Sequence, residues 1–531
     1  MPTLDQADEF GMHRGLESEE EEEEGRRLAD PVSVVLLLLI PTITAAVLVF
    51  DDIGQLPFWR DEAWSMSVAD RSIADTLEVL LNGETSMTLY YLLLNGWTEL
   101  GSSEGFVRSL SAVFAVVAVP MTILFARQAF SWPAAGIAGA VLALSDLLVV
   151  YGQEARSYGL VLLLAPLSYL FFVRAVQSGR GREWVLYTLT AAAMVYAHTL
   201  GGLLVVAQFA SLSLLPAVNV KWGYAARSLV GLAALCSPVL LSTLVDESNP
   251  SWVGALSLRQ LGSAASHLAG GRLLLLGFGI LFALAVLKLV LVLRRSGRSH
   301  AVWIRGLVLL WIALPPILLL AISGVKPLFV DRYLIGILPG IAVMAGAVIA
   351  GLRPRGVAWA AAGLLMAAMI GDVATREKPP PRTEDLRAAA SLVVTKARPG
   401  DGVAYSPPWG RVGFDYYLDR ISSSGGLVSD LDMKRGGTPL RTGEVLADEA
   451  AAQVVARRIR SSGSVWLVTY PDVSWDVSRD PVSEVGPTIF RRHFVRGGSW
   501  DFGEVSVTLY ERRTGGVALT SRSRDERKRS L

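Results

Sequence analysis

The stretch PVSVVLLLLIPTITAAVLVF, residues Pro31–Phe50, decides the fold class of this chain. It runs for twenty residues without a charged side chain. A helix rises about 1.5 Å per residue, so this stretch would be about 30 Å long, which matches the hydrocarbon core of a bilayer. The stretch therefore predicts a membrane-spanning helix near the start of the chain.

The overall composition agrees with a membrane protein. Of the 531 residues 52% are hydrophobic and 18% are charged, and the mean hydropathy is +0.43. These values exclude a purely soluble globular protein. The net charge of +1 gives no indication of a nucleic-acid partner, and we expect none. The single cysteine, Cys236, lies in an apolar run, so no disulfide framework is expected.

Apolar runs of similar length recur along residues 31–376, which we expect to form a transmembrane domain. They predict about eleven helices, near residues 32–50, 107–126, 133–151, 157–174, 183–198, 200–217, 228–245, 273–293, 303–323, 333–352 and 356–374. The segment Met87–Leu100 is apolar but only about 14 residues long, short of the roughly 17 that a span needs, so we expect it to lie at the membrane interface.

The basic residues set the predicted topology. If Met87–Leu100 is not a span, clusters such as Arg26/Arg27, Arg174/Arg180/Arg182 and Arg294/Arg295/Arg298 all lie on one side, which the positive-inside rule assigns to the cytoplasm. We therefore expect a multi-pass protein of the plasma membrane with a cytoplasmic N-terminus. Residues 1–30, with the run Glu19–Glu24, are expected to be a disordered acidic tail, with no cleavable signal peptide.

The composition changes after Lys378-Pro-Pro-Pro-Arg382. Residues 383–515 are typical of a soluble α/β domain, which this topology places outside the cytoplasm, and the charged residues 516–531 predict a disordered tail. The expected elements are a helix over Thr383–Ala397 and strands at Gly402–Tyr405, Ser464–Tyr470 and Glu504–Arg512. The predicted fold class is a polytopic α-helical membrane protein with a C-terminal soluble α/β domain.

Acidic residues follow the first span closely, in the long outer loop 51–106. The motif is Trp59-Arg60-Asp61-Glu62-Ala63-Trp64, flanked by aromatic residues of the kind found at membrane interfaces. A partly desolvated carboxylate at this place, Asp61 or Glu62, could have a raised pKa and serve as a general base. The alternative is a pair of solvated loop acids.

A second polar cluster, Tyr151–Tyr158, lies where two spans meet. Glu154 and Arg156 are costly to bury at a span end and need partners there, although they could also cap helices or extend to the interface. Two tyrosines, one of them Tyr158, lie in the same short turn.

Two further polar positions are expected on the outer face. Arg332 lies where positive charge is disfavoured, so it needs an anionic partner: a phosphate bound in bidentate geometry, or the adjacent Asp331. His198, in a helix break, could orient a substrate, bind a metal or be a hydrogen-bonded packing residue. Asp61, Glu154, His198 and Arg332 would then share one face of the membrane.

The order of these motifs resembles that of the GT-C membrane glycosyltransferases, in particular the bacterial mannosyltransferase-like branch akin to protein O-mannosyltransferases and lipid A aminoarabinose transferases. The resemblance covers about residues 30–375. It is carried by Asp61-Glu62-Ala63, Leu89-Tyr90-Tyr91, Arg108-Ser109-Leu110-Ser111, Gln153-Glu154-Ala155-Arg156-Ser157-Tyr158, Ala197-His198 and Arg332-Tyr333-Leu334. The stretch from Ala397 to Tyr417 is similar to the C-terminal domains of that branch.

The resemblance implies transfer of a sugar, mannose first and arabinose second, from a polyprenyl-phosphate donor in the membrane lipid to a glycan, lipid or protein acceptor outside the cytoplasm. It implies that Asp61, beside Glu62, acts as the base with inversion, that Glu154 is the second acidic position, and that Arg332 faces the lipid phosphate. Arg156 could assist Arg332. Further substrate-binding positions are Tyr158, Tyr90, Tyr91, His198 and Tyr333. A divalent ion held by Asp61 and Glu154 could contribute.

One motif departs from that family. Before Leu89 the family often has an aspartate and one or two prolines, whereas this chain has Gly83-Glu84-Thr85-Ser86-Met87-Thr88, which could reshape the acceptor side of the site. Two other functions stay open: a membrane transporter or lipid flippase, and an inactive homologue whose outer domain binds glycan.

Overall fold

The computed structural model describes residues 30–81, 84–216, 218, 220–245, 257–375, 384–422, 428–433, 449–470 and 480–513. The expected tails at 1–29 and 516–531 lie outside these residues. The chain forms two compact units, one of residues 1–57 and 64–381 and the other of residues 58–63 and 382–531. The division falls inside one helix, after Ala63, so the Asp61–Glu62 pair belongs to the second unit.

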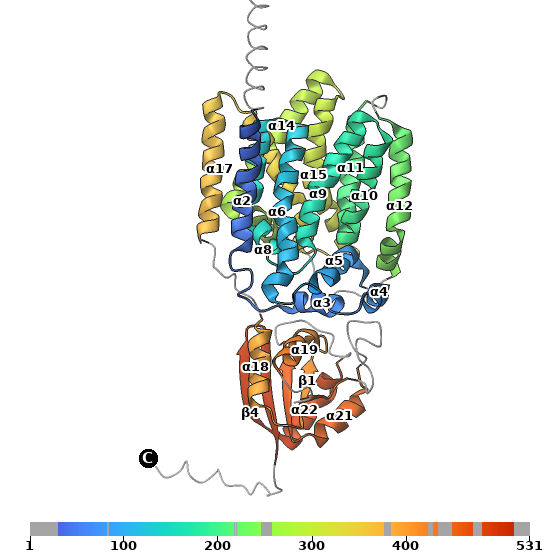
Figure 1. Cartoon of the computed structure of the whole chain (residues 1–531), viewed down its shortest axis with the longest axis vertical. Helices are drawn as coiled ribbons and strands as arrows, with labels where there is room; N and C mark the ends of the chain where they lie inside the picture. Colours follow the sequence, from blue (N-terminus) through green and yellow to red (C-terminus); the bar gives the residue numbers. More distant parts are fainter. Residues whose placement is uncertain are drawn as a thin grey trace, which may run out of the picture. The chain divides into compact units, whose positions relative to one another are not determined.

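The first unit is a bundle of helices (Figure 1). Its elements are α2 (Pro31–Phe50), α3 (Arg60–Ala69, shared with the second unit), α4 (Ile73–Leu81), η1 (Thr85–Met87), α5 (Thr88–Thr98), α6 (Glu104–Ala129), α7 (Trp132–Ala143), α8 (Asp146–Gly152), α9 (Tyr158–Ser178), α10 (Gly181–Ala197), η2 (Thr199–Gly201), α11 (Gly202–Ser211), η3 (Leu212–Leu214), α12 (Trp222–Val245), α13 (Leu258–Ala269), α14 (Arg272–Ser296), α15 (His300–Ser323), η5 (Asp331–Ile337), α16 (Leu338–Ala350) and α17 (Arg355–Thr375).

Within the described residues, eight helices are long and apolar enough to cross a membrane, or nine if α7 and α8, bent by 55°, count as one span. The predicted fold class is confirmed, but the expected number of about eleven is too high by this criterion. Each expected span has a helical counterpart. Two are shorter than a full crossing: α10 has 17 residues, and the run Thr199–Leu214 is split among η2, α11 and η3.

The segment Met87–Leu100 contains α5, which has only 11 residues and would be about 16 Å long. It is therefore too short to cross the bilayer, as its length in the sequence predicts. The turn η1 precedes it where the related family often has prolines, and the hydroxyl groups of Thr85 and Ser242 lie 2.6 Å apart there.

The helices differ in how far the protein covers them. In α9, and in the span formed by η5 and α16, 78% of the most apolar stretch is buried inside the protein, whereas in α14 only 6% is. Helices α6 and α9 pack closely, as do α7 and α16. A helix that is apolar on all sides but left uncovered fits a lipid-facing position, so α14 lies at the rim of the bundle and α9 in its interior.

The second unit contains a five-stranded sheet in the order β2-β1-β3-β5-β4. Strands β1 (Asp401–Ser406), β2 (Val428–Asp430) and β3 (Ser464–Thr469) are parallel, and β5 (Val505–Arg512) and β4 (Phe494–Phe502) add an antiparallel edge. The helices of this unit are α18 (Leu386–Lys396), α19 (Gly410–Ile421), α21 (Ala452–Ser461) and α22 (Pro481–His493).

The three expected strands and the expected helix of this unit are all present, as β1, β3, β5 and α18. Apolar side chains from β1, β3, α21 and α22 form a core that includes Ala404, Val465, Ile459 and Phe490. This core joins the sheet to α21 and α22.

Candidate active site

The turn between α8 and α9 is the centre of the polar cluster in the first unit. Glu154 and Arg156 are both buried there, 7% and 9% exposed. The side-chain amide of Gln153 donates to the carbonyl groups of Val49 and Asp51, at 3.1 and 2.7 Å. These two bonds fix the turn to the C-terminal end of α2. The charged pair is therefore held inside the protein and does not extend into solvent.

A chain of hydroxyl groups supports the same turn from α5 and α6. Ser111 Oγ donates to the carbonyl of Arg156 at 2.9 Å and lies 2.8 Å from the hydroxyl of Tyr90. Because the serine has one hydroxyl hydrogen and gives it to Arg156, Tyr90 must be the donor to Ser111. Helices α6 and α9 can approach closely here because Gly159 has no side chain. A Cβ at this position would lie only 2.4 Å from the Ser111 carbonyl oxygen.

Tyr90 also has a contact inside the protein. The rings of Tyr90 and Tyr91 are fully buried and meet edge to face at 6.4 Å. The hydroxyl of Tyr90 holds Ser111, and through it the backbone of Arg156. Tyr90 therefore stabilises the turn through Ser111, and its role in substrate binding stays a prediction.

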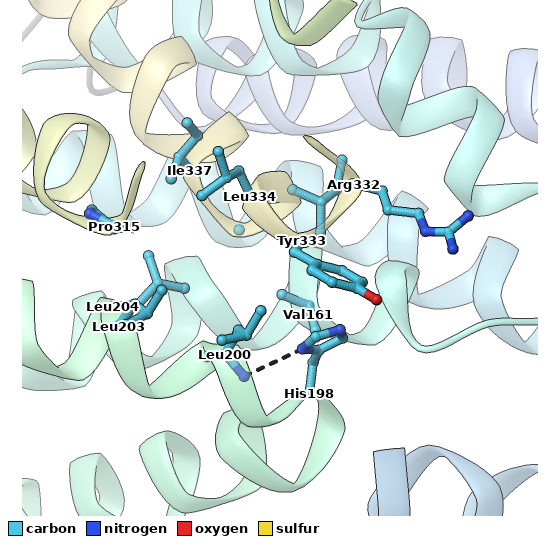
Figure 2. A pocket seen from close by; sticks show the side chains of 13 residues that line it. Val161, His198, Leu200, Leu203, Leu204, Pro315, Arg332, Tyr333, Leu334 and Ile337 are labelled. Atoms are coloured by element: carbon cyan, nitrogen blue, oxygen red, sulfur yellow. Dashed lines mark hydrogen bonds between the residues drawn. The ribbon is translucent and has the colours of Figure 1, made fainter. Parts of the chain in front are cut away.

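A row of aromatic rings connects the turn with η5. Ring centroids are 4.9 Å apart for Tyr151 and Tyr158, 6.2 Å for Tyr158 and His198, and 5.1 Å for His198 and Tyr333. Figure 2 shows the Tyr333 and His198 rings side by side. His198 Nδ1 accepts a hydrogen bond from the backbone N–H of Leu200 at 3.3 Å, so the ring hydrogen of the neutral imidazole is on Nε2.

Charged groups from two separate segments lie near this row, Glu154 and Arg156 in the turn between α8 and α9 and Arg332 in η5. Arg332 lines the same pocket as His198, and Arg156 Nη1 donates to Ser65 Oγ at 3.3 Å. The structure thus brings together six predicted site residues of the first unit: Glu154, Arg156, Tyr158, His198, Arg332 and Tyr333.

The carboxylate of Asp331 adjoins this cluster and contacts His267 of α13. Its Oδ2 lies 2.7 Å from His267 Nδ1, and its Oδ1 accepts the backbone N–H of Arg332 at 2.8 Å. The hydrogen bond raises the pKa of His267, which favours the charged imidazolium. Asp331 therefore forms an ion pair with His267, a contact that the sequence does not indicate.

A pocket lies beside the cluster. Its walls are apolar, with Val161, Leu203 and Leu204 among them, and His198 and Arg332 also line it (Figure 2). Of the two arginines, only Arg332 is among the described lining residues, and the volume of about 10 Å³ leaves room for about one water molecule.

Asp61 and Glu62 start helix α3 in the second unit. Glu62 is fully buried, and its Oε2 accepts the backbone N–H of Trp59 at 3.3 Å, as a helix-capping carboxylate does. The Asp61 side chain is 17% exposed, with its Oδ1 3.7 Å from Arg60 Nε. The alternative of two solvated loop acids is therefore wrong, and the bond made by Glu62 indicates a structural role beside Asp61.

The segment that carries Asp61 is fixed to the α/β unit by backbone contacts. The hydroxyl of Tyr417 accepts the N–H of Phe58 at 2.6 Å, and Glu384 Oε2 accepts the N–H of Arg60 at 3.0 Å. The Arg60 guanidinium lies 4.8 Å from the centre of the Trp409 ring. Burial raises the pKa of Glu384 to about 7, an effect that the charge of Arg60 partly opposes.

Several of these supporting residues were absent from the expected site. Arg108 is 1% exposed and donates to the carbonyls of Ile53, Leu56 and Pro57, at 3.0, 2.8 and 2.9 Å, so it shapes the start of the first loop. An arginine at the start of an apolar span is a signal that could have identified it. Glu384 gave no such signal, because its partner lies 324 positions earlier.

The residues that the structure describes include no group of three or more His, Cys, Asp or Glu side chains arranged to hold a metal ion. The predicted ion at Asp61 and Glu154 would need ligands from substrate or water in addition. It stays a prediction, and we derive no step through it.

Comparison with known proteins yields one family model and several structures. The family model described as dolichyl-phosphate-mannose-protein mannosyltransferase matches residues 87–241, less than half of the chain. This range includes Tyr90, Glu154, Arg156 and His198. No curated protein matches the sequence.

The solved structures share the architecture at low sequence identity. ArnT from Cupriavidus metallidurans bound to undecaprenyl phosphate has a TM-score of 0.53 and 12% identity, over 90% of this chain and 98% of that one. The archaeal oligosaccharyltransferase AglB from Archaeoglobus fulgidus, in complex with an inhibitory peptide and a dolichol-phosphate, has a TM-score of 0.50 and 10% identity, over 91% and 75%. This multi-span membrane protein therefore has the fold of the GT-C glycosyltransferases.

Proposed function

We propose that the chain is a membrane glycosyltransferase that moves a sugar from a polyprenyl-phosphate donor to an acceptor outside the cytoplasm. The observation that carries the proposal is the buried turn with Glu154 and Arg156, which the row of rings through His198 connects with Tyr333 beside Arg332, in a bundle with the fold of ArnT. Arg156 and Arg332 would neutralise a lipid phosphate there.

The proposed sugar transfer needs a base for the acceptor hydroxyl and positive charge near the departing phosphate. The acceptor hydroxyl attacks the anomeric carbon and loses its proton to Asp61, while the bond from that carbon to the phosphate oxygen breaks. The electron pair leaves with the polyprenyl phosphate, which gains negative charge as it departs. Arg332, with Arg156, would stabilise this charge most strongly in the transition state. A single displacement of this kind inverts the anomeric configuration.

Glu154 has a separate part in the proposal. A buried carboxylate two residues before Arg156 can hold that guanidinium in place when no phosphate is bound. It could also contribute one ligand to a divalent ion together with Asp61. Treatment with EDTA followed by Mg²⁺ or Mn²⁺ tests the ion: restored transfer would support it, and full activity in EDTA would exclude it.

Mannose is the proposed sugar and arabinose the second candidate, because the matched family model describes a mannosyl transfer. The acceptor is a glycan, a lipid or a protein. We further propose the cytoplasmic N-terminus and an extracytoplasmic α/β unit, which labelling of single introduced cysteines from either side of sealed vesicles would test.

The proposal is tested with purified protein in vesicles that contain labelled polyprenyl-phosphate mannose or arabinose. We expect cleavage of the donor, with polyprenyl phosphate and a labelled acceptor as products. A flippase would instead move the intact donor between leaflets, and a binding protein would leave it unchanged. Either of those results would contradict sugar transfer.

A further inference from the structure

The α/β unit contains a second cavity, distinct from the polar cluster of the first unit. It is open to solvent, has a volume of about 560 Å³, and lies between α22 and the strands β1, β3, β4 and β5. This volume lies within the range of small-molecule binding sites, roughly 300–1,000 Å³. Part of its wall is aromatic: Phe490 and Tyr510 stack with their ring centroids 4.2 Å apart. The cavity is therefore large enough for a ligand with an apolar face.

One end of the cavity is basic. Arg491, Arg496 and Arg513 line it, and none of the three forms an ion pair with another residue in the described part of the chain. No acidic side chain is among the described lining residues. Guanidinium groups bind carboxylate and phosphate oxygens in forked geometry. This end of the cavity fits an anion.

The other end offers hydroxyl oxygens. Ser406 and Ser483 both donate to Asp480 Oδ2 at 2.6 Å, and Thr469 donates to the carbonyl of Ser506 at 3.4 Å. The two serine oxygens also lie 2.8 Å apart, and because each hydroxyl hydrogen is used inside the protein, the three oxygens that line the cavity could meet a ligand only as acceptors. They therefore fit a ligand that carries hydroxyl donors.

The Asp480 carboxylate lies behind these hydroxyls and is not among the described lining residues. It is 1% exposed and accepts the backbone N–H groups of Val482 and Ser483 in addition to the two serines. Asp480 thus caps α22 from within. From Ser483 to Arg491 the helix advances eight residues, about 12 Å, which separates the two ends of the cavity.

From this arrangement we infer that the cavity between α22 and the sheet binds an acidic saccharide, with the sugar hydroxyls toward Ser406, Ser483 and Thr469 and the carboxylate or phosphate toward the three arginines. The sugar ring would lie against the aromatic wall. A free inorganic anion would use only one end, and a neutral sugar only the other. The inference goes beyond the proposed transfer chemistry and does not depend on it.

The test measures binding to the full-length protein in detergent by isothermal titration calorimetry. The probes are glucuronate, glucose 1-phosphate, glucose and inorganic phosphate. We expect saturable binding of at least one of the two acidic sugars, with glucose and inorganic phosphate each about tenfold weaker. Binding of glucuronate alone would identify a carboxylate ligand, and binding of glucose 1-phosphate alone a phosphate ester.

Variants locate the binding. Arg496→Gln and Arg491→Gln together should weaken the acidic sugar about tenfold, because each removes a charge-assisted bond. Thr469→Val should weaken it about fivefold and leave inorganic phosphate unchanged. Arg457→Gln, an exposed arginine of α21 outside the cavity, is the matched control.

The inference is overturned if neither acidic sugar binds, if glucose or inorganic phosphate binds as tightly as they do, or if Arg457→Gln weakens binding as much as the cavity variants. Binding is also measured in the Asp61→Asn protein. Unchanged affinity there, with transfer abolished, would show that the two proposals stand or fall separately.

Discussion

The carboxylate of Glu384 accepts a hydrogen bond from the backbone N–H of Arg60 at 3.0 Å, and this contact caps the helix that presents Asp61. The first N–H groups of a helix have no partner inside it, so a carboxylate supplied from elsewhere in the chain stabilises them and the positive end of the helix dipole. Glu384 also lies 3.8 Å from the Arg60 guanidinium. The α/β unit thus fixes the start of the helix that carries the proposed base.

We predict that Glu384→Ala lowers the stability of the protein by about 1–2 kcal/mol, the usual effect of a lost helix cap. It should also lower kcat more than it raises KM for the donor, because the position of Asp61 changes while the donor site does not. Glu384→Gln keeps an acceptor oxygen and should lose less. Asp419→Asn, at an exposed acid of the same unit, serves as the control. Unchanged kcat in Glu384→Ala would show that this contact does not position the base.

The raised pKa of Glu384 predicts a pH dependence of stability. Burial raises this pKa from the ordinary value of 4.5 to about 7, so the folded protein binds the proton more tightly than the unfolded chain. The resulting stabilisation is fully present below about pH 4.5 and is lost as the pH rises through 7. Wild-type protein should therefore lose more thermal stability between pH 5 and pH 8 than Glu384→Gln, which cannot ionise. An equal loss of thermal stability between pH 5 and pH 8 in the two proteins would contradict the raised pKa of Glu384.

Both the charge and the planar shape of the Arg332 side chain should contribute to sugar transfer. We predict that Arg332→Gln lowers kcat/KM about 100-fold, the usual loss when one donor to a developing anion is removed, and that Arg332→Lys recovers only part of it. Binding of polyprenyl phosphate, measured by titration, should weaken in the same order. Arg298→Gln, an exposed arginine between α14 and α15, should change neither quantity. Equal activity of the Gln and wild-type proteins would remove Arg332 from the mechanism.

The hydroxyl chain from Tyr90 to Arg156 predicts an indirect effect. Tyr90→Phe removes the donor to Ser111 and should cost about 1 kcal/mol of stability, because one buried hydrogen bond is lost. Since Tyr90 acts on the turn through Ser111 and the backbone of Arg156, KM for the donor should change less than kcat. Tyr196→Phe, which removes a more exposed hydroxyl bonded to the carbonyl of Leu235, is the comparison. A large increase in KM alone for Tyr90→Phe would indicate direct substrate contact.

The sequence predicts the apolar helices well because each is a long local pattern. Helix α2 matches the run that starts at Pro31, and α5 is as short as its sequence indicates. By length and composition fewer helices count as full crossings than the sequence predicts, because hydropathy does not show where an apolar run is bent or divided into short helices, as between α7 and α8 and within Thr199–Leu214.

The site was predictable where a charge interrupts an apolar run, as at Glu154, Arg156 and Arg332. It was not predictable where the partner is distant in the sequence. Nothing near Glu384 indicates Arg60, and nothing near His267 indicates Asp331, because both contacts form only after folding. The structural role of Glu62 was missed for a related reason: a capping carboxylate and a catalytic one look alike in the sequence.

The central claim is that Asp61 takes a proton during sugar transfer from a lipid-linked donor. The most direct measurement compares the rate of labelled sugar transfer by wild-type, Asp61→Asn and Glu78→Gln proteins in vesicles with labelled polyprenyl-phosphate mannose or arabinose. Glu78 is an exposed acid of the same loop. We predict that Asp61→Asn loses at least 100-fold in rate, while its affinity for the donor and the rate of Glu78→Gln stay within twofold of wild type. Full transfer activity in Asp61→Asn would contradict the account.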